Sequence, residues 1–354
     1  MNPPVTIRTL TDGGQTAVDV ATEVAAFLDG AKRTLELAQY DLELGPETAA
    51  IVGDAIRRAH DRGVRVRLVY NVDHRKPIPV PPPPSPDETL IRSLPVEAKA
   101  IAGIPDLMHH KYVVRDGEAV WTGSTNWTDD SWSRQENVVA IVESTGVAAD
   151  FQLDFAQLVC TESVADSGRV EPRWRDGVRA WFTPHHGEDL SHRMAQAIAH
   201  ARRRVRVCSP VITAGPVLAV LARTVADGQI DVAGCVDETQ VRGVAYQWSE
   251  EGKSWKLPLL ARVARGAFSA KPSTPFGTGT LHDFMHAKLT VVDDSIFLGS
   301  FNLSRSGERN AENVLEIEDP ALANRLVGFV DEVRARYPPL ELSARVVTQP
   351  SAGR

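Results

Sequence analysis

Apolar and polar positions along this 354-residue chain follow two different periods, and the periods change in a fixed order. Residues 16–30 carry apolar side chains three and four positions apart, which predicts a helix with one buried face. Residues 34–40 alternate like a half-buried strand, a second helix is expected from 46 to 63, and 64–70 again alternate. Strand, helix and strand in succession build parallel sheets, so we predict an α/β fold.

The second half of the chain repeats this order. Helices predicted at 190–201 and 216–226 are interleaved with strands at 205–209 and 230–236, and Gly215-Pro216 opens its helix as Gly45-Pro46 does. Each half then ends with three strands and a helix, at 112–114, 119–122, 138–142 and 148–159 and at 289–292, 296–298, 314–317 and 320–336. We therefore expect a first repeat over 1–165, a second over 166–340, and a C-terminal tail over 341–354.

A proline-rich stretch interrupts the first half. Seven of the ten residues from 77 to 86 are proline, which excludes a helix or a central strand. We interpret it as a stiff, extended loop inside the first repeat.

The composition is that of an ordinary soluble protein, with 43% apolar and 24% charged residues. A net charge of −7 argues against a surface that coats nucleic acid, and we interpret the nine arginines between 169 and 206 as solvated. The three cysteines lack metal-ligand spacing. Neither a signal peptide nor an apolar run long enough to span a membrane is visible, so we expect a cytoplasmic protein.

One polar motif occurs once in each half. It reads His-x-Lys, four residues, Asp, a short gap and Gly-Ser-x-Asn, and a Glu-Asn pair starts ten residues after the Asn. The gap is six residues in the first copy and five in the second. The motif positions are His109, Lys111, Asp116, Ser124, Asn126 and Glu136 in the first copy and His286, Lys288, Asp293, Ser300, Asn302 and Glu312 in the second. Two copies with matched glutamates indicate a duplicated site.

These residue types suit chemistry at phosphorus. One histidine can attack while the other protonates the leaving group, if the two halves face each other across a pseudo-two-fold axis. Lysine ammonium groups, asparagine amides and serine hydroxyls can hold an oxyanion, and the lysines fill the electrostatic role of a metal, so we predict neither metal nor cofactor. Glu136 and Glu312 are expected to accept the far N–H of each imidazole.

The paired motifs resemble those of the phospholipase D superfamily, over most of the chain. The resemblance implies two α/β repeats, each a mixed sheet flanked by helices, with one active site between them. It implies a covalent phosphohistidine resolved by water or an alcohol, with His109 and His286 as nucleophile and acid/base, and we favour His109 as the nucleophile. Lys111, Lys288, Asn126 and Asn302 would bind the phosphate, helped by the hydroxyls of Ser124 and Ser300. Asp116 and Asp293 would orient the motif without reacting.

Several alternatives remain at this stage. The plain motif most resembles the endonuclease-like branch, so we expect a nucleic-acid or related phosphodiester first, a phospholipid headgroup second, and an idle binding scaffold last. The duplication predicts a monomer that contains its own pseudo-dimer. His110 should face away from His109 as a packing or surface residue. His282 and His286 have a spacing that binds zinc on a helix, but their segment leads into a strand.

Overall fold

The computed structural model describes residues 5–74, 86–250, 252–274 and 281–342. The predicted proline-rich loop, apart from Pro86, and the predicted tail beyond residue 342 lie outside the described residues.

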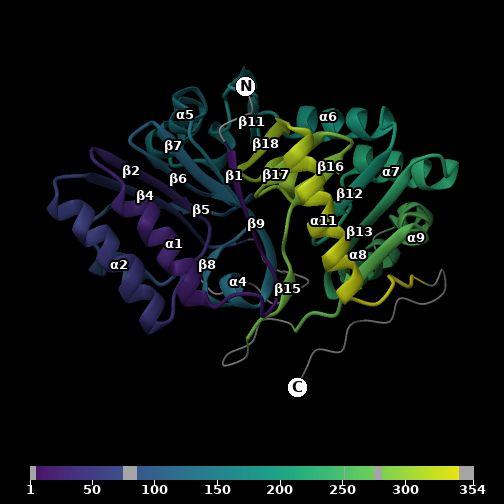
Figure 1. Ribbon diagram of the computed structural model, residues 1–354, viewed down its shortest axis with the longest axis horizontal. Coiled ribbons are helices and arrows are strands. Elements are labelled where there is room, and N and C mark those ends of the chain that lie inside the picture. The colour runs from purple at the N-terminus through teal and green to yellow at the C-terminus, as the bar shows by residue number, and fades with distance from the viewer. Residues whose placement is uncertain (1–4, 75–85, 251, 275–280, 343–354) are drawn as a thin grey trace.

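Two β-sheets lie side by side and have the same strand order (Figure 1). The first contains, from edge to edge, β1 (Val5–Leu10), β9 (Gln135–Val142), β7 (Ala119–Gly123), β6 (Lys111–Arg115), β2 (Thr34–Gln39), β4 (Arg65–Val72) and β5 (Glu97–Ala102). The second contains β10 (Trp174–Arg175), β11 (Val178–Thr183), β18 (Glu312–Glu318), β17 (Ser295–Gly299), β16 (Leu289–Val292), β12 (Arg204–Cys208), β13 (Asp231–Asp237) and β14 (Ala267–Lys271). Apart from β10, each strand of one sheet has a counterpart at the same place in the other.

Both sheets are mixed, as predicted. The strands joined through helices, β2, β4 and β5 in one sheet and β12, β13 and β14 in the other, are parallel. The motif hairpins, β6–β7 and β16–β17, are antiparallel. Two short strands, β3 (Leu42–Glu43) and β8 (Trp127–Thr128), form a separate pair, and β15 (Phe284–Met285) joins the edge of β9. The prediction of two mixed α/β repeats is confirmed.

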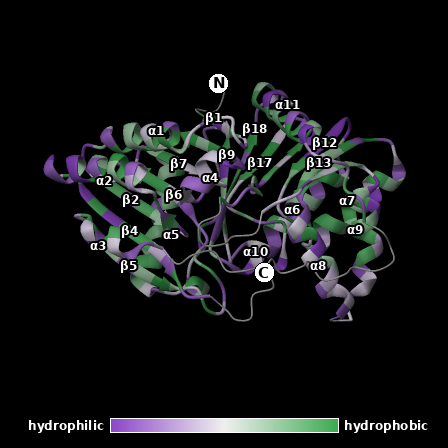
Figure 2. Cartoon of the chain, turned by 90° about the horizontal axis from the view of Figure 1, so that it is seen from below, coloured by the Kyte–Doolittle hydropathy of each residue, from purple (hydrophilic) through white to green (hydrophobic). Residues whose placement is uncertain are grey.

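The helices cover the sheets on the outside and fill the space between them. The first half contains α1 (Ala17–Asp29), α2 (Pro46–Asp61), α3 (Glu88–Ser93), α4 (Asp129–Ser133), α5 (Thr145–Thr161) and the 3₁₀ turn η1 (Val164–Asp166). The second contains α6 (Gly187–Ala199), α7 (Gly215–Asp227), α8 (Glu238–Glu250), η2 (Ser254–Lys256), α9 (Leu257–Ala264), α10 (Arg305–Arg309) and α11 (Pro320–Arg336). The strands consist mainly of hydrophobic residues, whereas the helices contain both hydrophobic and hydrophilic residues (Figure 2).

Three apolar cores result. One lies under α1 and α2, one under α6, α7 and α9, and the third is shared by both halves. The shared core contains Phe151 and Phe155 of α5 together with Leu326 and Val330 of α11. Because the shared core is built from both repeats, burial of its apolar side chains holds the two sheets together.

Some elements escaped the sequence analysis. Strands β1 and β11 each pair with the last strand of their own repeat, and neither was predicted. For three of the nine arginines between 169 and 206, the structure also corrects the interpretation that they are solvated. Arg179 and Arg193 bond to the buried carboxylate of Glu316, and the buried Arg206 bonds to Asp231 and Asp331.

The motif aspartates hold the turn that precedes the first central strand of each sheet. The Asp116 carboxylate accepts hydrogen bonds from the backbone N–H groups of residues 32, 33 and 34, at 2.9, 2.7 and 2.9 Å. Asp293 does the same for residues 202, 203 and 204, at 2.8, 2.9 and 3.1 Å. Partial burial opposes ionisation, but these donors outweigh it and lower the pKa of both carboxyls. Both aspartates therefore have a structural position, away from the histidines.

We predict that Asp293→Ala lowers the free energy of unfolding by about 2–3 kcal/mol at pH 7, because three N–H groups lose a charged acceptor. A carboxyl with a lowered folded pKa stabilises the protein above its unfolded pKa of about 3.9, and that contribution is lost as the pH falls through the folded pKa. The difference from wild type should therefore shrink at acid pH. Urea unfolding followed by circular dichroism measures both effects.

The neighbouring Asp294→Ala is the matched control. Asp294 makes an exposed ion pair with Arg203 at 2.7 Å, which contributes no more than about 1 kcal/mol. Equal losses in the two variants would contradict the structural role of Asp293.

Candidate active site

Each histidine motif is completed by the last strand of the opposite half. The backbone N–H of His109 donates to the carbonyl oxygen of Ala311 at 2.9 Å, and that of His286 donates to the carbonyl oxygen of Glu136 at 3.2 Å. Met108 forms a parallel bridge with Ala311, and β15 pairs in parallel with the start of β9. The two motifs thus meet where β9 and β18 begin.

Equivalent polar side chains fix the residue before each histidine. The Asn71 Oδ1 atom accepts from the backbone N–H of Met108 at 3.0 Å, and the Asp237 Oδ2 atom accepts from that of Met285 at 3.2 Å. Asn71 and Asp237 lie at matching ends of β4 and β13 and are buried. The sequence analysis missed both, although a buried polar residue ending an apolar parallel strand is a usable signal.

The fold brings the two motif histidines and the two motif lysines together and buries all four. Lys111 Nζ donates to the carbonyl oxygen of His109, and Lys288 Nζ to that of His286, both at 2.7 Å. Burial is the largest influence on all four groups: it lowers the pKa of Lys111 to about 7 and that of Lys288 well below its usual value. Burial and then the two lysines hold the pKa of both histidines well below 6.5, which favours neutral imidazoles.

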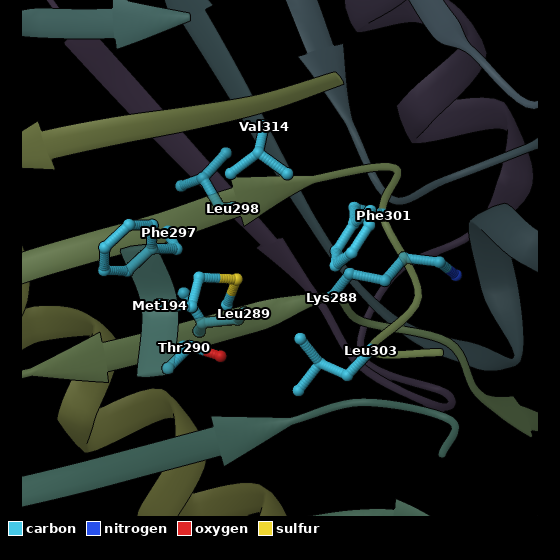
Figure 3. A pocket seen from close by; sticks show the side chains of 9 residues that line it. All are labelled: Met194, Lys288, Leu289, Thr290, Phe297, Leu298, Phe301, Leu303 and Val314. Atoms are coloured by element: carbon cyan, nitrogen blue, oxygen red, sulfur yellow. The ribbon is translucent and has the colours of Figure 1, made fainter. Parts of the chain in front are cut away.

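The stem of Lys288 packs along an apolar cluster in the second half (Figure 3). Its ammonium nitrogen points away from these side chains. Besides Lys288, the pocket at this place is lined by Met194, Leu289, Thr290, Phe297, Leu298, Phe301, Leu303 and Val314. The methylene groups are therefore buried favourably while the charged end is directed elsewhere.

His109 is oriented by a carboxylate. Its Nδ1 atom lies 2.8 Å from Glu312 Oε2, as predicted for one glutamate of the pair, and the glutamate comes from the other repeat. Burial raises the pKa of Glu312 to about 7, against the opposing charge of Lys111. The ring of Tyr40 lies 4.5 Å from that of His109 and 4.7 Å from Lys111 Nζ, a contact that the motif could not indicate.

His286 has a different partner, and this corrects the prediction for Glu136. The Nδ1 atom of His286 lies 3.1 Å from Asn137 Oδ1. Glu136 turns instead to Lys271 Nζ at 2.9 Å and accepts from the hydroxyl of Tyr337. Lys271 is buried on β14, where the equivalent position of β5 is Ile101, so only the second sheet offers this cation.

A second sequence difference maintains the asymmetry. His110 is buried, and its Nδ1 atom accepts from Asn313 Nδ2 at 3.1 Å, while Asn313 Oδ1 accepts from Thr122 at 2.7 Å. Asn313 is therefore engaged and leaves Glu312 to His109. The second copy has Ala287 in place of His110, so the equivalent Asn137 can reach His286. The predicted packing role of His110 fits this position.

The serines do not offer hydroxyls to a substrate, which corrects the prediction. Ser124 is buried, donates to Asn137 Oδ1 at 2.7 Å and accepts from the backbone N–H of Val138 at 3.0 Å. Ser300 is likewise buried and accepts from the backbone N–H of Asn313 at 3.0 Å. Both hydroxyls hold the turn between two strands against the last strand of their own repeat.

The asparagines of the Gly-Ser-x-Asn motifs, unlike the serines, have side-chain oxygens that are free of protein hydrogen bonds within the described residues. Asn126 and Asn302 are half-buried just after β7 and β17. Their Oδ1 atoms are enclosed and have no hydrogen-bond partner within the part of the chain that the structure describes. Each amide therefore has an unused hydrogen-bond acceptor in the site.

Carboxyl groups surround the first motif. Asp41 follows β2 and is buried; burial, then Glu43, raises its pKa to about 7, although Lys111 opposes the shift. Asp130 is among the charges that raise it further. In the described ranges, no three His, Cys, Asp or Glu side chains converge in a way that could hold a metal ion. No helix in those ranges is both long and apolar enough to cross a bilayer.

Comparison with curated proteins finds partial relatives. Residues of this chain are 30% identical over 133 positions to the mitochondrial cardiolipin hydrolase of Xenopus laevis, covering 36% of this chain and 56% of that protein. The mitochondrial cardiolipin hydrolase of Chlamydomonas reinhardtii is 27% identical over 142 positions, covering 39% and 57%. The chain thus spans about half the length of the curated relatives it matches.

Solved structures share the whole fold. The phosphatidylserine synthase of Haemophilus influenzae superposes with a TM-score of 0.65 at 13% identity, over 95% of this chain and 88% of that one. The polyphosphate kinase of Porphyromonas gingivalis gives a TM-score of 0.58 at 12% identity, over 94% and 47%. At these identities the likeness concerns the fold alone.

A family model described as "Cardiolipin synthase, PLD-like domain" matches this chain twice, over residues 24–159 and 194–333. The two matches fall on the two sheets and include both histidine motifs. With its duplicated motifs and sheets, the chain belongs to the phospholipase D superfamily.

Proposed function

We propose that this chain is a phosphodiesterase that cleaves a phospholipid phosphodiester through a covalent phosphohistidine on His109. The observation that carries the proposal is the pair of unequal imidazoles in one buried site. His109 Nδ1 faces a carboxylate at 2.8 Å, whereas His286 Nδ1 faces an amide oxygen at 3.1 Å. A carboxylate partner stabilises the positive charge that an attacking imidazole acquires, and an amide does so less.

In the first step, the Nε2 lone pair of His109 forms a bond to phosphorus while the bond to the leaving alcohol breaks. The Nδ1–H group donates to Glu312, which stabilises the charge that develops on the ring. His286, protonated, delivers its Nε2 proton to the departing oxygen. Burial disfavours that protonated state in the empty site, and the negative charge of a bound phosphodiester restores it.

In the second step, His286 is neutral and acts as a base. It takes a proton from water, or from an alcohol, as the oxygen attacks phosphorus and the bond to His109 Nε2 breaks. His109 returns to its neutral form and His286 to its protonated form, so the cycle closes. Water gives hydrolysis and an alcohol gives transfer.

The lysines and asparagines would hold the non-bridging oxygens. Lys111 and Lys288 reach the site from opposite halves, and a phosphate between them counteracts the burial that lowers their pKa values. Asn126 and Asn302 can supply amide N–H donors. No step of this scheme requires a metal ion, because the ammonium groups neutralise the charge that develops.

Two observations favour a phospholipid over the nucleic acid that the motif alone suggested. The relatives that this chain partly matches are named cardiolipin hydrolase, and that name describes a lipid phosphodiester. Carboxyl groups gather near the first motif, since, after burial, Glu43 and Asp130 both contribute to the raised pKa of Asp41, and Asp130 contributes to that of Glu43. Ionised carboxyls at this place repel the repeated phosphates of a nucleic acid. Arg179, Arg193 and Arg206 are engaged in ion pairs and form no basic groove.

A substrate panel tests this function. The purified chain, incubated in EDTA with a chromogenic diester, with phosphatidylcholine or cardiolipin dispersed in excess neutral detergent, and with single-stranded DNA and RNA, should turn over the chromogenic diester and the lipids. Release of water-soluble alcohol or of nitrophenolate is the measurement. Loss of all turnover in EDTA, or turnover of nucleic acid alone, would contradict the proposal.

The two motif glutamates provide a matched pair of variants. Glu312→Gln should lower kcat by about 10²-fold, since His109 loses its carboxylate partner. Glu136→Gln should instead lower the free energy of unfolding by about 3 kcal/mol, because Lys271 is left buried with a weaker partner. Its kcat per folded molecule should stay within about threefold of wild type. Steady-state kinetics and urea unfolding of both variants distinguish the roles, and an equal loss of kcat in both would refute the asymmetry.

A further inference from the structure

The repeat extends upstream of the histidines. Residues 104–109 read Ile-Pro-Asp-Leu-Met-His and residues 281–286 read Leu-His-Asp-Phe-Met-His. Both copies have a large aliphatic residue five positions before the histidine, an Asp three before, and an apolar residue two before. Neither the fold nor the proposed chemistry explains the aliphatic residue five positions before each histidine, Ile104 and Leu281.

That position is exposed in both copies. Ile104 and Leu281 are each 56% exposed, two of the few large apolar side chains on the surface of the described residues. Further along each segment, Leu107 and Phe284 are half-buried, and Met108 and Met285 are fully buried. Each segment thus forms an apolar path from solvent to a histidine, and the Phe284 ring lies 5.4 Å from that of His286.

Hydrogen bonds on the polar side hold both segments in place. In the first, the backbone N–H of Leu107 donates to Asn310 Oδ1 at 2.9 Å, and Asp106 pairs with Arg309 at 3.1 Å. In the second, the backbone N–H of His282 donates to Asp130 Oδ2 at 3.1 Å, and its carbonyl oxygen accepts from Gln135 at 3.2 Å. With the backbone fixed, Ile104 and Leu281 are presented to solvent.

Both exposed residues lie at the end of the sheets where the site opens. The strand β6 starts opposite the carboxyl end of β2, where Lys111 faces Gln39, and β16 starts opposite the carboxyl end of β12, where Leu289 faces Cys208. The segments that precede β6 and β16 therefore continue past the carboxyl ends of the parallel strands. They flank the histidines from the two halves.

We propose that Ile104 and Leu281 form an apolar rim that inserts into a zwitterionic phospholipid surface and places the lipid phosphodiester at His109. The proposal rests on the proposed function. Exposed aliphatic side chains beside a polar site gain from burial in the acyl region. Arg309 pairs with Asp106 at 3.1 Å and Arg134 with Asp12 at 2.6 Å, but unlike the buried arginine pairs these side chains are 47% and 38% exposed. Their remaining N–H groups can donate to lipid phosphates. Asp106 and Asp283 would repel a strongly anionic surface.

The test uses the full chain, phosphatidylcholine vesicles and the double variant Ile104→Ser/Leu281→Ser. Sedimentation with vesicles in 150 mM salt should show binding of wild type and about tenfold weaker partitioning of the variant, since two partly buried aliphatic side chains are lost from the acyl region. Turnover of the vesicle lipid should fall by a similar factor. Turnover of a soluble chromogenic diester should stay within about twofold.

The matched control is Leu153→Ser on α5, where an equally exposed leucine, at 55%, lies outside the two segments. It should bind vesicles like wild type. Three results would overturn the proposed role of the rim: no vesicle binding by wild type, unchanged binding by the double variant, or an equal loss of binding in Leu153→Ser. So would a wild-type dimer that the double variant dissociates, because a second copy would then cover these residues. Vesicle binding is read without turnover, so failure of the rim and failure of the catalytic proposal are distinguishable.

Discussion

The structure depends on reciprocal backbone hydrogen bonds between its two halves. Each histidine motif pairs through its backbone with the last strand of the opposite repeat, at Ala311 for His109 and at Glu136 for His286. The same contact brings the side chain of Glu312 to the ring of His109 across the interface. A single repeat would have the histidine and the lysine but neither the strand that fixes the motif nor the carboxylate that orients the ring. Duplication within one chain supplies both the strand and the carboxylate at a fixed geometry. The apolar core that α5 and α11 share stabilises this arrangement.

Duplication also allowed the copies to diverge. Symmetric sheets and symmetric backbone contacts contain an asymmetric pair of imidazoles, and two substitutions account for it. Lys271, where the first sheet has Ile101, attracts Glu136 away from the site. His110, where the second motif has Ala287, engages Asn313 and leaves Glu312 to His109. The two motif histidines have thereby become a ring beside a carboxylate and a ring beside an amide, which fits the different roles that the proposed two-step transfer gives them.

Much of the fold and part of the candidate site could be predicted from the sequence. The features that could not be predicted depend on contacts between different strands or different halves. Periodicity predicted two α/β repeats, and the family resemblance carried by the repeated motif implied mixed sheets and a structural position for the motif aspartates. These features are local, or recur in register. The partners of Glu136 and the contact between the rings of Tyr40 and His109 depend on residues far apart in the chain. The exclusion of Ser124 from the site depends on a hydrogen bond to the next strand of the sheet. Such contacts leave no spacing pattern in the sequence. The symmetric motif therefore predicted that both glutamates accept from a histidine, whereas in the structure only Glu312 does so.

The most direct test of the central claim, that unequal partners make His109 the nucleophile, is to trap the covalent intermediate. Bis(4-nitrophenyl) phosphate has a leaving group that needs no acid, so His286→Asn should still be attacked but should resolve slowly. After rapid quenching in alkali, mass spectrometry of the digested variant should find one nitrophenylphosphoryl group on the peptide that contains His109. The variant His109→Asn should carry none. An adduct on His286, in wild type or in His109→Asn, would contradict the account.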